Sequence, residues 1–134
     1  MYLTHKPLIA VVDDDQSIRE ALENLISSVG FEVKLFASAE DFLDSSLQPD
    51  CAILDVRLPG ISGLELQRRL AADGQSIPVI IITAQGDDKT QDEAVAAGAI
   101  AFLNKPFKEE VLLAALESAL TRKDQVVRDT RKRG

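Results

Sequence analysis

Aromatic side chains and sulfur are scarce in this chain of 134 residues. It contains no Trp, one Tyr, five Phe, one Met and one Cys, and aromatic residues make up only 4% of it. A single cysteine, Cys51, excludes an internal disulfide and favours a reducing, cytoplasmic setting. Because aromatic residues are so few, Val, Ile, Leu and Ala must fill most of the core.

Long apolar runs are missing as well. No stretch approaches the ~20 consecutive apolar residues that a membrane helix requires. The first seven residues, Met1 to Pro7, lack the apolar segment of a secretory signal. The length, with 46% hydrophobic and 28% charged residues, fits one globular domain. We therefore expect a cytoplasmic protein with no membrane partner.

Charge is unevenly distributed along the chain. The net charge is −7, but residues 122–134 hold six basic and two acidic side chains, a local charge of +4, which leaves −11 on the preceding body. An acidic body does not attract nucleic acid by bulk electrostatics. We expect residues 1–121 to form the folded domain and residues 122–134 to be a basic helical extension or the start of a linker.

Short apolar runs alternate with stretches of helical period. The strands are predicted at 8–12, 31–36, 51–54, 79–82 and 100–103. The helices are predicted at 18–29, 38–47, 64–70, 87–97 and after Pro106. In the first helix Val29 belongs to the apolar face, and Gly30 lies just past its end, where a left-handed cap is needed. Gly98 stops the helix at 87–97. Gly63 is predicted to lie in the loop before the third helix. Such alternation favours an α/β fold, a doubly wound five-stranded parallel sheet with helices on both faces.

Polar residues follow four of these strands, at the point where each apolar run ends. Asp13, Asp14 and Asp15 follow the first strand, Asp55 the third and Thr83 the fourth, and Lys105 comes just after the fifth. The carboxyl ends of parallel strands share one edge of a sheet, where open α/β folds bind their ligands. Carboxylates there suit a hard cation, Mg²⁺ or also Mn²⁺, and Lys105 and Thr83 suit a phosphoryl group.

Each residue also has an ordinary structural interpretation. The acidic run can cap the following helix, a role that suits Asp15 or Gln16. Asp55 can belong to a turn, Thr83 can bond the local backbone, and Lys105 can extend along the surface into water. The combination at four strand ends, rather than any single residue, indicates a site.

The motifs resemble the receiver domain of two-component response regulators over about residues 6–122. They are Val12-Asp13-Asp14-Asp15, Asp55-Val56-Arg57-Leu58-Pro59-Gly60, Thr83-Ala84 and Lys105-Pro106-Phe107. Ser38 to Leu43, Ile82 to Asp87 and Gly98 to Phe102 look most like FixJ-type receivers. The resemblance implies a flavodoxin-like sheet with strand order 2-1-3-4-5 and a cis bond between Lys105 and Pro106.

The resemblance also implies roles for individual residues. Asp55 would be the phosphoacceptor, and Asp13, Asp14, Asp55 and the backbone carbonyl of Arg57 would hold Mg²⁺. Lys105 would assist phosphoryl transfer, and Thr83 and Phe102 would switch the face made by the helix at 87–97, the strand at 100–103 and the last helix. The partners would be a sensor histidine kinase and a second copy bound through that face. DNA would be reached only through an output domain that this chain lacks.

Three alternatives stay open. The chain can be a free-standing phosphorelay receiver without DNA output. It can be a flavin-binding electron carrier of the same topology, although the acidic loop at 13–15 would repel a flavin phosphate. It can be a phosphohydrolase, although Arg57 stands where such enzymes carry an acid–base aspartate, so we expect no multiple-turnover enzyme.

Overall fold

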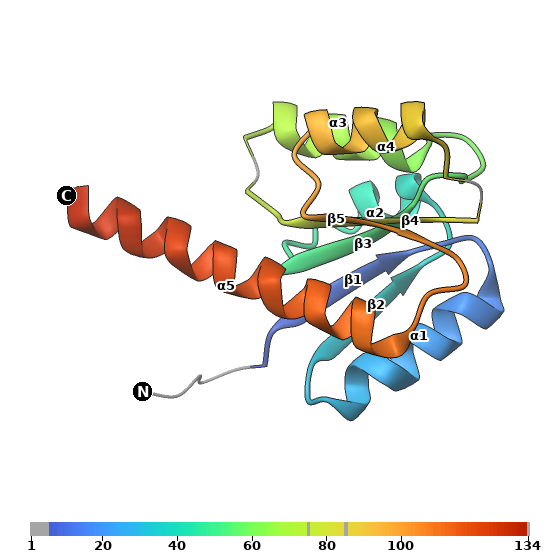
Figure 1. The fold of residues 1–134 in the computed structure, drawn as a ribbon, viewed down its shortest axis with the longest axis horizontal. Helices are drawn as coiled ribbons and strands as arrows, with labels where there is room; N and C mark the ends of the chain where they lie inside the picture. The colour runs from blue at the N-terminus through green and yellow to red at the C-terminus, as the bar shows by residue number, and fades with distance from the viewer. Residues whose placement is uncertain (1–5, 75, 85, 134) are drawn as a thin grey trace.

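The computed structural model describes residues 6–74, 76–84 and 86–133, with side chains as far as Thr121. Figure 1 shows a central sheet between two layers of helices. The strands are β1 (Leu8–Val12), β2 (Glu32–Phe36), β3 (Cys51–Asp55), β4 (Val79–Thr83) and β5 (Ala101–Asn104). The helices are α1 (Gln16–Ser28), α2 (Ala39–Asp44), α3 (Gly63–Ala72), α4 (Asp88–Ala96) and α5 (Glu109–Arg133).

All neighbouring strands of the sheet run parallel, in the order β2-β1-β3-β4-β5. This confirms the predicted fold class and strand order. β1, β3 and β4 are the three inner strands, and both of their faces are covered by helices. Their side chains are buried apart from the partly exposed Leu8, which explains why they appear in the sequence as unbroken apolar runs.

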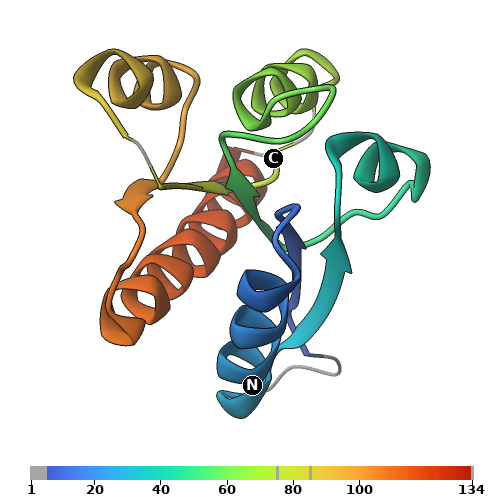
Figure 2. The ribbon, with the colours of Figure 1, turned by 90° about the vertical axis from the view of Figure 1, so that its right-hand side faces the viewer.

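Helices cover both faces of the sheet (Figure 2), and a layer of apolar side chains holds them there on each face. On one face α2, α3 and α4 pack through Phe42, Leu66, Leu70 and Ala94. On the other face α1 and α5 pack through Leu22, Ile26, Leu112 and Leu116. The sheet is therefore a rigid platform, and the loops at its carboxyl edge project functional groups from fixed strand ends.

The observed boundaries correct two local predictions. Val29 is the residue that ends α1, and it is 46% exposed, so it does not belong to the buried face. Gly63 is the first residue of α3 rather than a loop residue, because the Ser62 hydroxyl caps this helix by accepting the Glu65 N–H. Gly30 does adopt the expected left-handed conformation, with φ of 94°, and Gly98, after the end of α4, has φ of 98°.

The last helix continues well past the sheet. Its backbone is helical as far as Arg133, and its C-terminal part projects away from the body of the domain (Figure 1). The side chains of residues 122–133, residue 134 and residues 1–5 lie outside the described part of the structure. The division into a domain at 1–121 and a basic extension at 122–134 therefore stays a prediction. No helix in the described part has the length and apolar character needed to cross a membrane.

Candidate functional site

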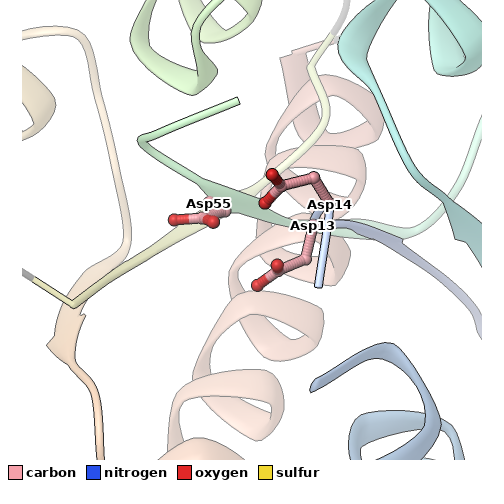
Figure 3. Close-up of side chains that lie close together, drawn as sticks. All are labelled: Asp13, Asp14 and Asp55. Atoms are coloured by element: carbon pink, nitrogen blue, oxygen red, sulfur yellow. The ribbon is translucent and has the colours of Figure 1, made fainter. Parts of the chain in front are cut away.

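Three carboxylates meet at the carboxyl edge of the sheet (Figure 3). Asp13 and Asp14 directly follow β1, and Asp55 is the last residue of the adjacent strand β3. Each side chain offers an oxygen, and these three oxygens lie within 4.8 Å of one another. Asp13 and Asp55 are buried while Asp14 is exposed, so the group is open to solvent on one side.

Asp15, the third member of the acidic run, has a different role. Its carboxylate caps α1 by accepting the Ser17 N–H at 2.8 Å and the Ile18 N–H at 3.4 Å. Its own N–H donates to Asp13 Oδ1 at 2.9 Å. The helix-cap interpretation is thus correct for Asp15, and Asp13 and Asp14 remain for the site.

Lys105, the residue after β5, contacts two of these carboxylates. Its Nζ donates to Asp13 Oδ2 at 2.8 Å and lies 3.4 Å from Asp55 Oδ2. Its side chain is only 16% exposed, so it is not a lysine extended along the surface into water. Burial alone would lower the pKa of this ammonium, but the hydrogen bond to Asp13 and the charges of Asp13 and Asp55 raise it overall. Lys105 is therefore a fixed positive charge.

Asp55 lies in a setting that disfavours its ionised form. Burial raises the pKa of its carboxyl, and the neighbouring Asp13 charge raises it further. The Lys105 ammonium and the Arg57 N–H, 3.4 Å from Asp55 Oδ1, lower this pKa without cancelling the rise. Three carboxylates facing one ammonium leave an excess of negative charge, which a cation would neutralise.

The donor set fits a hard divalent cation. Carboxylate oxygens with one solvent-exposed side match the preference of Mg²⁺ and Mn²⁺ for oxygen ligands and retained water. The Arg57 backbone lies beside Asp55, as its N–H contact shows. The use of the Arg57 carbonyl as a further ligand stays a prediction.

Thr83 and Phe102 lie on the next two strands. Thr83 is the last residue of β4 and is fully buried, and its carbonyl accepts the Lys105 N–H at 2.7 Å. Phe102 in β5 is partly buried against the α2–α4 face of the core. Gly86, in the loop that follows Thr83, lies so close that a Cβ there would overlap the Phe102 ring. The loop after β4 and the Phe102 ring are thus in direct contact. The Lys105–Pro106 bond is cis, as the resemblance implied.

Gly63 is a functional position that the sequence analysis missed. A Cβ on Gly63 would overlap the backbone carbonyl of Asp55, and the Gly63 N–H donates to the Val56 carbonyl at 3.1 Å. The start of α3 therefore packs directly against the end of β3. The sequence shows only a glycine between Ser62 and the predicted start of the third helix at Leu64, and the reason for it appears once β3 and α3 are placed together.

We expect Gly63→Ala to lose about 1–3 kcal/mol of stability, because the added methyl must displace the Asp55 backbone. It should also weaken Mg²⁺ binding. The matched control is Gly30→Ala, where a Cβ meets no atom within 4 Å but φ is 94°. That variant should lose about 1 kcal/mol through backbone strain alone and bind Mg²⁺ normally. Urea unfolding with and without Mg²⁺ measures both effects, and an unchanged Gly63→Ala protein would contradict the packing role.

The fold and the site define a doubly wound α/β domain with an acidic cluster at the carboxyl edge of its sheet, and comparison with known proteins identifies its family. The family model "Response regulator receiver domain" matches residues 9–117. The chain belongs to the receiver domain family of two-component response regulators.

Individual relatives place it near FixJ within that family. It is 49% identical over 115 residues to the response regulator protein TmoT of Ectopseudomonas mendocina, covering 84% of this chain and 52% of TmoT. It is 42% identical over 120 residues to the transcriptional regulatory protein FixJ of Bradyrhizobium diazoefficiens, covering 88% and 58%. The structure of the response regulator StyR matches with a TM-score of 0.84 at 45% identity, over 96% of this chain and 67% of StyR. The chain spans about half the length of the curated relatives it matches.

Proposed function

We propose that this domain accepts a phosphoryl group on Asp55 from a sensor histidine kinase, in a reaction that requires Mg²⁺. The observation that carries the proposal is the cluster itself. Asp55 Oδ2 lies 3.4 Å from the Lys105 ammonium, and its carboxylate lies beside those of Asp13 and Asp14. A carboxylate flanked by a cation-binding pair and an ammonium is a suitable nucleophile for phosphoryl transfer.

The transfer exchanges one bond to phosphorus for another. An Asp55 carboxylate oxygen attacks phosphorus, the bond to the donor histidine nitrogen breaks, and that nitrogen leaves with the bonding electron pair. The product is an acyl phosphate with about two negative charges near neutral pH. Lys105 is placed to offset charge on the phosphoryl oxygens. A metal bound by Asp13, Asp14, Asp55 and the Arg57 carbonyl would supply further positive charge, so catalysis consists of positioning and electrostatics.

Phosphorylation of Asp55 would change the conformation of the face formed by α4, β5 and α5. In this proposal the Thr83 hydroxyl moves toward a phosphoryl oxygen and Phe102 turns inward. The close approach of Gly86 to the Phe102 ring supports such coupling, because it packs the loop after Thr83 against that ring. The face formed by α4, β5 and α5 is then the two-state element, and a second copy of the chain would bind there.

The output is a change in a partner or in an attached domain, in the cytoplasm. The similarity to a transcriptional regulatory protein supports control of transcription through a separate DNA-binding domain. A phosphorelay receiver without DNA output is the alternative. Multiple-turnover hydrolysis is not part of the proposal, since Arg57 occupies the position where phosphohydrolases carry an acid–base aspartate.

We expect acetyl phosphate to add one phosphoryl group to the protein in the presence of Mg²⁺ and none in the presence of EDTA. The reason is that the Asp13 and Asp14 carboxylates beside the Asp55 nucleophile repel a phosphoryl donor until a cation neutralises them. Intact-mass spectrometry over a time course measures the added group, and Mn²⁺ in place of Mg²⁺ should restore it. Equal labelling in EDTA would show that phosphorylation does not require a divalent cation.

A further inference from the structure

Arg19, in the first turn of α1, reaches back to the metal-binding loop. Its Nη1 donates to the backbone carbonyl of Asp13 at 2.8 Å, and the side chain is half-buried. A helical side chain points toward the helix N-terminus, so an arginine at this position naturally covers the preceding loop. None of the roles described above uses this residue.

Hydrogen bonds fix the residues on both sides of Asp14, and the Arg19 side chain makes one of them. Its guanidinium binds the Asp13 carbonyl, whereas the Arg19 backbone N–H makes the first helical hydrogen bond of α1, to the Asp15 carbonyl at 3.0 Å, whatever the side chain. The Asp13 N–H is in turn fixed to the Phe36 carbonyl of β2 at 3.1 Å. Asp14, the exposed member of the acidic pair, therefore lies between the Asp13 carbonyl, which the Arg19 side chain holds, and the start of α1 at Asp15.

The guanidinium acts on the backbone rather than on the carboxylates. Within the described part of the chain, the ion pairs of Lys and Arg are those of Lys105 with Asp13 and Asp55, and of Arg68 and Arg69 with Glu65. Arg19 is therefore not within 4.0 Å of any described carboxylate oxygen. The positive charge of Arg19 would by itself weaken cation binding at this site. The presence of an arginine here therefore needs another explanation.

We propose that Arg19 is a positioning residue that holds the loop at Asp13–Asp15 in the geometry required for a divalent cation. This inference rests on the proposed function of the site. Groups that orient metal ligands typically contribute 10–100-fold to metal affinity. The two possible contributions of Arg19 have opposite signs: loss of the hydrogen bond to the Asp13 carbonyl weakens Mg²⁺ binding, whereas loss of a nearby positive charge tightens it.

The test compares Arg19→Ala, Arg19→Lys and the control Arg68→Ala, which removes an exposed arginine whose ion pair among the described residues is with Glu65. Calorimetric titration of the full chain with Mg²⁺ should show about tenfold weaker binding for Arg19→Ala, an intermediate loss for Arg19→Lys and no loss for Arg68→Ala. Equal or tighter binding by Arg19→Ala would overturn the proposal.

Hydrogen exchange in metal-free protein gives a second readout. The Asp15 N–H, bound to Asp13 Oδ1, should exchange faster in Arg19→Ala and partly recover in Arg19→Lys, while amides of β3 keep their protection. Unchanged exchange at Asp15 would also overturn the proposal. If the wild-type chain fails to bind Mg²⁺, the proposed function fails, and the exchange experiment still decides the role of Arg19.

Discussion

Asp55→Asn is expected to abolish phosphorylation while leaving the domain folded. The amide has nearly the same shape as the carboxylate but lacks the nucleophilic oxygen, so no acyl phosphate can form. Incubation with acetyl phosphate and Mg²⁺, followed by intact-mass spectrometry, should detect no added phosphoryl group. Treatment of the labelled wild-type protein with hydroxylamine should remove its label, as expected for an acyl phosphate.

The control for this variant is Asp44→Asn, which changes an exposed carboxylate at the end of α2, away from the site. It removes the same charge and should be labelled as fast as the wild-type chain. Labelling of Asp55→Asn at the wild-type rate would place the acceptor elsewhere and refute the proposed function.

Asp55→Asn should also be more stable than the wild-type chain in metal-free buffer. The pKa of Asp55 is raised in the folded state, so the folded state binds the proton more tightly than the unfolded state does. Stability therefore falls as pH rises from the ordinary value of 3.8 through the raised folded pKa, and above that pKa the full penalty is present. Thermal unfolding of Asp55→Asn should lack this part of the pH dependence.

The architecture and the strand-end residues could be predicted from sequence because both follow from local patterns. The inner strands are buried on both faces, so the runs ending at Val12, Asp55 and Thr83 stand out as apolar. A parallel sheet then brings all their carboxyl ends to one edge without knowledge of any side-chain contact. The resemblance to receiver domains added the strand order and the residue roles.

Contacts between elements could not be predicted in the same way. The sequence predicts a loop at Gly63, because it does not show that α3 begins against the Asp55 carbonyl. No side-chain motif marks Arg19, because its partner is a backbone carbonyl six residues earlier. Helix geometry alone offered a signal, since an arginine in the first turn of α1 points back toward the acidic loop.

The second large effect is expected for Lys105→Ala, which removes the only ammonium bound to the described carboxylates of the site. Asp13 is fully buried and Asp55 nearly so, and both would lose their cationic partner. Loss of one partner of a buried ion pair lowers the free energy of unfolding by about 3 kcal/mol. Because Lys105 is partly exposed, we expect Lys105→Ala to lose about 3 kcal/mol or less. Phosphorylation by acetyl phosphate should slow by about 100-fold, since one charge that stabilises the transferring group is gone.

A double-mutant cycle separates the two roles of Lys105. In metal-free buffer, Lys105→Ala should cost less in an Asp55→Asn background, because Asp13 is then the only charged partner left without the ammonium. We expect a coupling of about 1 kcal/mol between positions 55 and 105, measured by urea unfolding. Saturating Mg²⁺ should reduce this coupling, because a bound cation would compensate the same carboxylates. Additive effects in metal-free buffer would mean that the 3.4 Å contact between Lys105 and Asp55 contributes nothing to folding, and Lys105 would then stabilise the site through Asp13 alone.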